Sequence, residues 1–435
     1  MNRPYQPLSR RQRMCRQIFF KILADLGGGV ISFRDADGGH QLGSFDSPDA
    51  LEVNVAIWDG AFYCAAVTGQ SAGVGRSYMQ GMWDCDQLVN LIRIFARNEK
   101  VLRRWTAPTQ GLTGLWHRFS FWLQRNTRRG ARRNISYHYD LGEDYFAQFL
   151  DPGLTYSCAF FAHPGQDLAP AQTEKLDRVC RKLGLGPGDH LLEIGTGWGS
   201  MAIHAATRYG CRVTTTTISA EQARYADEKI RRLGLGDRIK VIQKDYRDLT
   251  GQYDKLVSLE MIEAVGVKYY PAYFRKCAEL LKPEGAMVLQ AITVDDRHFR
   301  HDARHVDFIK RYIFPGGVLP SVQVMNNTVA RATDFQLVHL EEMGLHYART
   351  LELWRENLTD AWTVMQEQGR TEEFLRCWEF YFAYCEGGFR ERRIGAAQLV
   401  LAKSECRELP LLNLGSAGYA PAMDQPLRRQ EGEAS

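Results

Sequence analysis

Hydrophobic and polar residues from about residue 170 onward follow helical spacing and strand-like spacing in turn. The helix-like segments cover 170–183, 200–208, 220–233 and 270–281, and the strand-like segments cover 190–194, 212–217, 240–243, 255–259 and 286–293. This alternation predicts an α/β fold with a parallel, doubly wound sheet. Ligands in such folds bind beyond the carboxyl ends of the strands. We therefore expect the site in residues that directly follow a strand.

The first 100 residues have a different pattern and predict a smaller α+β domain. Residues 9–26 place Phe19, Phe20, Ile22 and Leu23 among arginines, which predicts a basic amphipathic helix. Strand-like runs at 29–33 and 51–57 and a helix at 87–97 follow. We expect an N-terminal domain over 1–100, a basic aromatic linker over 101–136, the second domain over 137–408 and a disordered tail over 409–435.

The sequence LLEIGTGWG at 191–199 predicts a buried strand that turns sharply into a helix. Glycine lets the backbone approach a ligand closely and adopt positive φ. The spacing G-x-G-x-G differs from the dinucleotide fingerprint G-x-G-x-x-G, and threonines stand near the second strand, where a dinucleotide enzyme needs an acid. With Glu193 beside the turn, this pattern favours S-adenosylmethionine. The alternatives are a nicotinamide dehydrogenase, which the spacing disfavours, and a glycine turn that binds nothing.

Three strand ends converge on this predicted cofactor site. The expected contacts there are Glu193, Gly195, Gly197 and Gly199 after one strand, Thr217, Ile218, Ser219 and Gln222 after the next, and Asp245, Tyr246 and Arg247 after a third.

Composition narrows the class of protein only a little. The 435 residues are 45% hydrophobic, and the ten cysteines form no C-x-x-C pair, so neither a metal site nor a disulfide framework is expected. No apolar run is long enough to span a bilayer, and the N-terminal sequence lacks a signal-peptide core. These features predict a cytoplasmic protein, soluble or peripherally bound at the inner face of the membrane. They leave the oligomeric state open between a monomer and a homodimer.

The net charge of +4 is small, but residues 101–139 hold eight arginines and no acid, interleaved with tryptophan and phenylalanine. Arginines beside interfacial aromatic rings are typical of a segment that lies on an anionic membrane. A solvated face is the alternative. Nucleic acid is disfavoured as a partner, because no nucleic-acid-binding motif accompanies the arginines.

Nine segments, in this order along the chain, resemble the cyclopropane-fatty-acyl-phospholipid synthase family of S-adenosylmethionine-dependent fatty acid methyltransferases. They are residues 137–142, 154–158, 193–199, 218–222, 245–249, 261–266, 312–317, 347–351 and 385–389. The front domain, through residues 81–86, is similar to the extra domain of family members that act on membrane phospholipids. The resemblance implies a Rossmann-like methyltransferase sheet and adds Tyr156 and Ser157 to the cofactor contacts.

The resemblance also implies a reaction. The methyl of S-adenosylmethionine is transferred to the cis double bond of an unsaturated phospholipid acyl chain, and loss of a proton closes a cyclopropane ring. An alkene is a poor nucleophile, so alignment in a water-free pocket matters most. Aromatic faces stabilise the cation that forms. The candidate rings are Tyr139, Tyr156, Phe160, Phe161, Tyr312, Phe314 and Tyr381.

In the family, a bicarbonate ion is the base that removes the proton. The resemblance assigns its contacts to Cys158, through backbone or thiol, to Glu263, which accepts from the bicarbonate hydroxyl, to the backbone of Ile292 and to the phenol of Tyr347. Structural roles are the alternatives for Glu263 and Tyr347.

Two positions complicate this assignment. Gln290 stands where the usual bacterial pattern has histidine, and an amide can hold bicarbonate but cannot take up a proton. Cys385 matches a cysteine sometimes assigned as active in the family, although a buried structural cysteine explains it equally well. The sequence therefore keeps two alternatives to ring closure, namely a methylene- or methyl-branched product and a non-catalytic lipid-surface binding protein.

Overall fold

The computed structural model of the protein describes residues 3–46, 48–106 and 141–410. Most of the expected linker and of the expected tail lies outside these ranges. The N-terminal domain contains α1 (Arg10–Ile22), β1 (Gly29–Asp35), β2 (Gly38–Ser44), β3 (Leu51–Ile57), α2 (Ala61–Met79), β4 (Trp83–Cys85), α3 (Leu88–Arg97) and α4 (Glu99–Thr106). Its sheet has the order β2-β1-β3-β4. The predicted α+β class is confirmed, while β2, α2, β4 and α4 are additions to the predicted elements.

The helix α1 begins one residue later than predicted because Ser9 caps it. The Ser9 hydroxyl accepts from the backbone N–H of Gln12, and the Gln12 side chain accepts from the backbone N–H of Ser9. This reciprocal pair satisfies two N–H groups that a helix start leaves without partners. Phe19 and Phe20 of α1 are buried, and the arginines lie on the other face.

The second domain is built on a seven-stranded sheet with the order β10-β11-β9-β8-β5-β6-β7. Its strands are β5 (His190–Ile194), β6 (Arg212–Thr217), β7 (Ile239–Gln243), β8 (Tyr253–Leu259), β9 (Leu281–Val294), β10 (Gln336–Glu342) and β11 (Ile394–Ala402). The five strands from β9 to β7 are parallel, as predicted. The strands β10 and β11 were not predicted, and β11 runs antiparallel to both β9 and β10.

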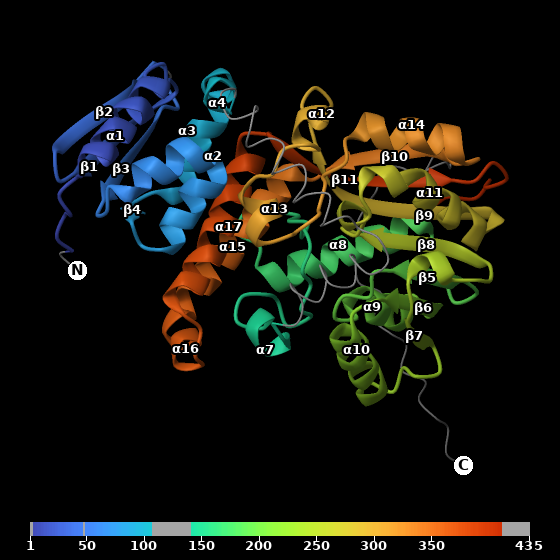
Figure 1. Ribbon diagram of the computed structural model, residues 1–435. Helices are drawn as coiled ribbons and strands as arrows, with labels where there is room; N and C mark the ends of the chain where they lie inside the picture. The colour runs from blue at the N-terminus through green and yellow to red at the C-terminus, as the bar shows by residue number, and fades with distance from the viewer. Residues whose placement is uncertain (1–2, 47, 107–140, 411–435) are drawn as a thin grey trace, which may run out of the picture.

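Helices cover both faces of this sheet (Figure 1). The predicted helices are present as α8 (Leu168–Leu183), α9 (Ser200–Arg208), α10 (Ala220–Arg232) and α11 (Tyr270–Leu280). The other helices are α7 (Glu143–Phe146), α12 (Phe299–Asp302), α13 (Phe308–Tyr312), α14 (Val322–Ala332), α15 (Gly344–Asp360), α16 (Trp362–Glu367) and α17 (Glu372–Arg390), with short 3-10 turns at 246–248, 262–264 and 267–269. The sequence pattern did not predict these additional elements.

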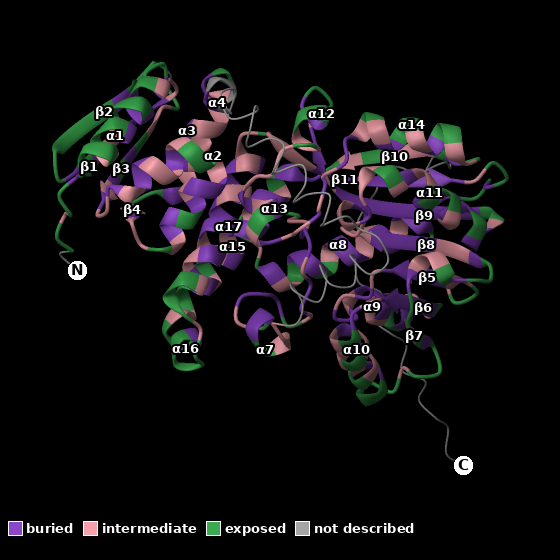
Figure 2. Cartoon of the chain, viewed as in Figure 1, coloured by how far each residue is buried: buried purple, intermediate pink, exposed green. Residues whose placement is uncertain are grey.

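The long helices α15 and α17 lie between the N-terminal domain and the large sheet (Figure 1). Phe380 of α17 packs against Tyr78 and Trp83, with ring centroids 5.6 and 6.4 Å away. Arg376 donates to the backbone oxygens of Tyr78 and Trp83 and to the Asp84 carboxylate. One hydrophobic core therefore runs through both domains, as the buried helices at the centre of Figure 2 show.

No helix in the described ranges is both long and apolar enough to cross a lipid bilayer.

Candidate active site

A cavity of about 600 Å³ extends from the glycine turn after β5 to the N-terminal domain. At one end it is lined by residues that follow β5, β6, β7 and β8. At the other end its walls come from α2, α3, α4 and α17, including Val74, Phe95, Trp105 and Phe380. Both domains therefore line one largely apolar space, and the polar groups gather where the strands end.

Most of the expected cofactor contacts meet in this cavity. Its lining includes Tyr156, Ser157, Glu193, Gly195, Gly197, Thr217, Ile218, Gln222, Asp245, Tyr246 and Arg247. Gly199 and Ser219 are not part of the lining. A side chain at Gly199 would press on Ala226 of α10, and the Ser219 hydroxyl caps α10 by accepting from the Gln222 N–H. These two residues shape the site without facing it.

The glycine turn has the backbone conformation that its sequence predicts. Gly195 and Gly197 have φ values of +105° and +52°, and a Cβ at Gly197 would meet nothing within 4 Å. Beneath the turn, Glu193 is buried, and its Oε2 has no hydrogen-bond partner among the described residues. Burial raises the pKa of Glu193 to about 8. An open backbone turn beside an unpartnered polar oxygen fits a polar, cationic cofactor such as S-adenosylmethionine.

The side chains after β6 and β7 are held by short local hydrogen bonds. The Thr217 hydroxyl donates to Gln222 Oε1 at 2.9 Å. The Asp245 carboxylate accepts from Arg247 Nε and Nη2 at 2.8 and 2.6 Å, and it also accepts from the Arg247 backbone N–H. The expected contact from Asp245 is therefore engaged with Arg247, and this pair fixes the turn after β7.

Glu263 lines the cavity, as expected, but its carboxyl group forms its hydrogen bond with the backbone of the chain itself. Its Oε1 accepts from the Ile292 backbone N–H at 2.6 Å, and its Oε2 has no partner among the described residues. Burial, and next the neighbouring Glu260, raise the pKa of Glu263 to about 8. Glu263 is therefore mainly a neutral carboxylic acid at pH 7. The Ile292 N–H that the resemblance assigned to bicarbonate is used by this acid.

Glu260, which follows β8 directly, was missed by sequence reasoning. Its Oε1 accepts from the Cys158 backbone N–H at 2.9 Å and from Gln290 Nε2 at 2.7 Å, and its Oε2 accepts from the Tyr347 hydroxyl at 2.6 Å. The Cys158 N–H and the Tyr347 hydroxyl were assigned to bicarbonate, and the Gln290 amide was expected to be able to hold it. Those residues therefore do not fit a separate bicarbonate ion, because their donors already bind a carboxylate of the chain. An acid at the carboxyl end of a buried strand was the signal that could have identified Glu260.

Cys158 and Gln290 lie behind the cavity wall. The Cys158 thiol points to the backbone oxygens of Ala159 and Met343, so only its backbone N–H is available to the site. Cys385 does line the cavity, and burial raises the pKa of its thiol, which keeps it protonated and a poor nucleophile. A thiolate role for Cys385 therefore has no support in this geometry.

Lys175 of α8 is a second residue that sequence reasoning missed. It is fully buried, lines the cavity and donates to the Ser157 hydroxyl at 2.8 Å. Burial lowers the pKa of Lys175, while Glu260 and other acids oppose that shift. A positive charge here stabilises the carboxylates beneath the cavity.

Backbone strain is concentrated in this region. Among the described residues, four non-glycine residues have positive φ, and three of them, Gln70, Leu154 and Glu260, line the cavity. A left-handed conformation costs such a residue roughly 1–2 kcal/mol. Strained residues of this kind cluster at functional sites, where the surrounding structure holds them in place. The strain at Glu260, with φ of +53°, is compensated by its three hydrogen bonds.

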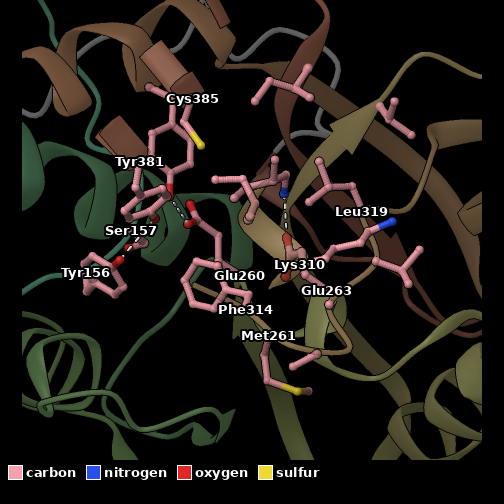
Figure 3. Close-up of a pocket in the computed structure, with 18 of the residues that line it drawn as sticks. Tyr156, Ser157, Glu260, Met261, Glu263, Lys310, Phe314, Leu319, Tyr381 and Cys385 are labelled. Carbon is pink, nitrogen blue, oxygen red and sulfur yellow. Dashed lines mark hydrogen bonds between the residues drawn. The ribbon is translucent and has the colours of Figure 1, made fainter. Parts of the chain in front are cut away.

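The aromatic rings that were expected to face a cation divide into two groups. Tyr156, Phe314 and Tyr381 line the cavity, and the hydroxyls of Tyr156 and Tyr381 are 3.1 Å apart (Figure 3). Phe160, Phe161 and Tyr312 lie outside the lining, so the expectation is wrong for these three. Tyr139 lies outside the described residues. Three electron-rich faces therefore remain near the buried carboxylates.

The sheet order, the glycine turn and the cavity at the strand ends define the class of an S-adenosylmethionine-dependent methyltransferase. Solved structures of similar fold agree. The cyclopropane synthase MmaA2 from Mycobacterium tuberculosis is 31% identical with a TM-score of 0.59, covering 62% of this chain and 98% of that chain. The cyclopropane synthase CmaA1, solved in complex with SAH and CTAB, gives the same values.

The chain belongs to the mycolic acid cyclopropane synthetase family, whose family model matches residues 126–399. It is 41% identical to the tuberculostearic acid methyltransferase UfaA1 of M. tuberculosis, over 76% of this chain and 78% of that protein. It is 36% identical to the cyclopropane-fatty-acyl-phospholipid synthase of Escherichia coli, over 81% of this chain and 88% of that protein. Family membership identifies the protein as a methyltransferase that acts in lipid chemistry.

Proposed function

We propose that the protein methylates the cis double bond of an unsaturated phospholipid acyl chain and that deprotonation then closes a cyclopropane ring. The observation that carries this proposal is the single cavity that joins the glycine turn to an apolar space walled by both domains. Apolar walls suit a hydrocarbon chain, and buried carboxylates at the junction suit the removal of a proton.

Some residues of the chain would bind the cofactor, and others would align the acyl chain, exclude water and stabilise the cation. The turn at Gly195 and Gly197, with Gln222 and the Asp245–Arg247 pair, would hold S-adenosylmethionine, which supplies an electrophilic methyl group when bound. The apolar walls align the double bond and keep water out, because water would trap a carbocation. Tyr156, Phe314 and Tyr381 present aromatic faces that stabilise positive charge on the acyl chain.

A second candidate function is methyl transfer without ring closure, giving a methylene-branched chain. The 41% identity to a protein named as a tuberculostearic acid methyltransferase favours it, and so does an amide at Gln290. In both functions a proton must leave the cation. Loss of a proton from the added methyl with direct C–C bond formation closes the ring, whereas a hydride shift to the cationic carbon before that loss gives the methylene branch.

We also propose that the protein contacts the membrane peripherally, because its substrate would reside there. The support is the run of eight arginines with interleaved aromatic residues in 101–139, most of which lies outside the described residues. The basic face of α1 adds positive charge on the N-terminal domain. A homodimer stays an untested alternative to a monomer.

One experiment tests the function. Purified protein is incubated with labelled S-adenosylmethionine and vesicles of dioleoyl phosphatidylglycerol, and the released fatty acids are analysed by mass spectrometry before and after mild hydrogenation. We expect a labelled acid one methylene heavier than oleate that resists hydrogenation. A labelled product that takes up hydrogen favours the methylene candidate.

Vesicles of a saturated phosphatidylglycerol are the matched control and should give no labelled fatty acid. Absence of product from the unsaturated vesicles, with S-adenosylmethionine binding intact in calorimetry, would overturn the proposed substrate. Absence of both binding and product would instead favour a non-catalytic lipid-surface protein.

A further inference from the structure

We propose that Glu260 is the catalytic base of this enzyme and takes the place of bicarbonate. This inference rests on the proposed function, since it needs a substrate cation that loses a proton. Its basis is the position of the Glu260 carboxylate, which lines the cavity and binds the donors that an external anion would require. In the view of Figure 3, Glu260 lies near Tyr156, Ser157 and Tyr381, while Glu263 lies near Lys310 and Leu319.

The arrangement of donors leaves one lone pair for a proton. A carboxylate oxygen can accept about two hydrogen bonds. Oε1 of Glu260 accepts two, from the Cys158 N–H and from Gln290 Nε2, whereas Oε2 accepts only from the Tyr347 hydroxyl among the described residues. Oε2 is therefore the atom that receives the proton.

The orientation of the Gln290 side-chain amide is fixed by Lys182, which acts through Gln398. Lys182 can only donate, and it donates to Gln398 Oε1 at 2.5 Å. The Gln398 amide nitrogen must then face Gln290 Oε1, which it does at 2.9 Å. The Gln290 amide nitrogen is thereby turned toward Glu260. This chain of amides makes Gln290 a positioning residue that donates to the base, and it needs no histidine.

A bicarbonate ion bound beside the Glu260 carboxylate is unfavourable. Glu260 lies in a fully buried region, and its charge already contributes to the raised pKa of the neighbouring Glu263, so a further negative charge beside it is disfavoured. Burial raises the pKa of Glu260 above its usual value, while the three donors oppose that rise. Glu260 is therefore more basic than a solvent-exposed glutamate, while its three donors favour the charged form.

The proton-transfer step balances without any external co-reactant. After methyl transfer, a C–H bond of the added methyl breaks and its electron pair forms the new C–C bond to the cationic carbon. The proton moves to Glu260 Oε2, so a carboxylate and a cation become a carboxylic acid and a neutral ring. When the product leaves, water entering the cavity takes the proton from Glu260.

The test compares bicarbonate dependence in three proteins, using the dioleoyl phosphatidylglycerol assay in buffer stripped of carbon dioxide. We expect wild-type turnover to be the same with and without added bicarbonate. Glu260→Gln should bind S-adenosylmethionine normally in calorimetry and lose at least about 100-fold in kcat, which is typical of removing an acid–base group. Glu260→Gly should lose turnover in stripped buffer and recover part of it when bicarbonate is added.

Glycine is well suited to this test because the backbone at 260 already has a left-handed φ of +53°. The Glu260→Gly variant leaves the Cys158, Gln290 and Tyr347 donors available to a small anion. A readout independent of turnover is line broadening of ¹³C-labelled bicarbonate in NMR, which should occur with Glu260→Gly and not with wild type.

Glu379→Gln is the matched control. Glu379 also accepts from a tyrosine hydroxyl at 2.6 Å, from Tyr78, but it does not line the cavity. It should leave kcat unchanged. Three results would overturn the inference: wild-type turnover that requires bicarbonate, Glu260→Gln with kcat within a few-fold of wild type, or Glu260→Gly that neither binds nor responds to bicarbonate. If the wild-type protein gives no product at all, the proposed function is wrong, and that result is distinct from the three results that concern Glu260.

Discussion

Gln290 on β9 and Gln398 on β11 are directly opposite each other in the sheet, and Gln398 Nε2 donates to Gln290 Oε1 at 2.9 Å. Both side chains are fully buried. Lys182 donates to Gln398, and Gln290 in turn donates to Glu260 at the cavity surface. The two glutamines therefore connect Lys182 to Glu260 by hydrogen bonds.

The variant Gln398→Met breaks this link while filling similar volume. We expect kcat to fall by about tenfold, because losing a buried hydrogen bond costs about 1 to 1.5 kcal/mol and Gln290 can then turn away from Glu260. Affinity for S-adenosylmethionine should not change. Steady-state kinetics with calorimetry measures both. Gln323→Met, at an exposed position of α14, is the control, and wild-type turnover in Gln398→Met would contradict the positioning role.

The hydrogen bond from Tyr347 to Glu260 Oε2 predicts a shifted pH profile. Its donation lowers the pKa of Glu260, so Tyr347→Phe should raise that pKa. The acidic limb of the kcat profile should therefore move to higher pH, since the base must be ionised to act. Tyr78→Phe removes the same kind of bond from Glu379 and should leave the profile in place. An unshifted profile in Tyr347→Phe would argue against Glu260 as the base.

Glu263 makes stability depend on pH. Its pKa is raised from 4.5 to about 8 in the folded protein, so the native state holds a proton that the unfolded chain has released between those values. Stability therefore falls as pH rises through this window. Glu263→Gln should remove that loss, so its melting temperature should gain on wild type as pH rises from about 5 to 8. The comparison is made by calorimetric melting across that range.

Glu228→Gln, at a side chain that is 62% exposed, is the control for this effect. A melting-temperature difference between Glu263→Gln and wild type that is constant with pH would show that Glu263 ionises in the folded protein as it does in the unfolded chain.

The open space beside Gly197 predicts a specific loss of cofactor affinity. Gly197→Ala introduces a methyl group at a φ of +52° that meets no protein atom. We expect about 1–2 kcal/mol of strain and, beyond this, at least a tenfold weaker S-adenosylmethionine affinity, roughly 1.4 kcal/mol or more. Gly234→Ala, at φ of +68° with no neighbour, should show the strain alone. Equal calorimetric affinities in the two variants would place the cofactor elsewhere.

Salt should weaken membrane binding if the basic segment contacts anionic lipid. Charge–charge attraction between exposed groups is screened as ionic strength rises. The paired variant Arg128→Gln with Arg129→Gln should bind phosphatidylglycerol vesicles less tightly and with a smaller salt dependence in sedimentation. The control pair is Arg231→Gln with Arg297→Gln, whose side chains are 76% and 80% exposed. Salt-independent binding by wild type would favour a solvated face instead.

The parts of the site that the sequence predicted are the ones encoded locally. The glycine turn, Glu193 before it and the helix after it lie within one stretch, and the periodic pattern places that stretch at a strand end. Glu260 could not be assigned in this way, because its donors at Cys158, Gln290 and Tyr347 are 102, 30 and 87 residues away. The resemblance pointed to those donors and assigned them to bicarbonate, whereas in the structure they donate to Glu260.

The arrangement of the last third of the chain could not be predicted from the local sequence pattern either. The strand β11 reads as a buried apolar run, and such a run does not state whether it pairs parallel or antiparallel. The helix α17 is apolar on more than one side because it contacts both α15 and the N-terminal helices α2 and α3. Only the assembled core explains those residues.

The left-handed backbone at position 260 has a consequence for how such enzymes diverge. Codons for glycine and glutamate differ by a single nucleotide, and the left-handed backbone at position 260 suits glycine. One point mutation can therefore exchange a tethered base for a vacant anion pocket. Lipid methylation in a cell carrying Glu260 would then be independent of its supply of dissolved carbon dioxide.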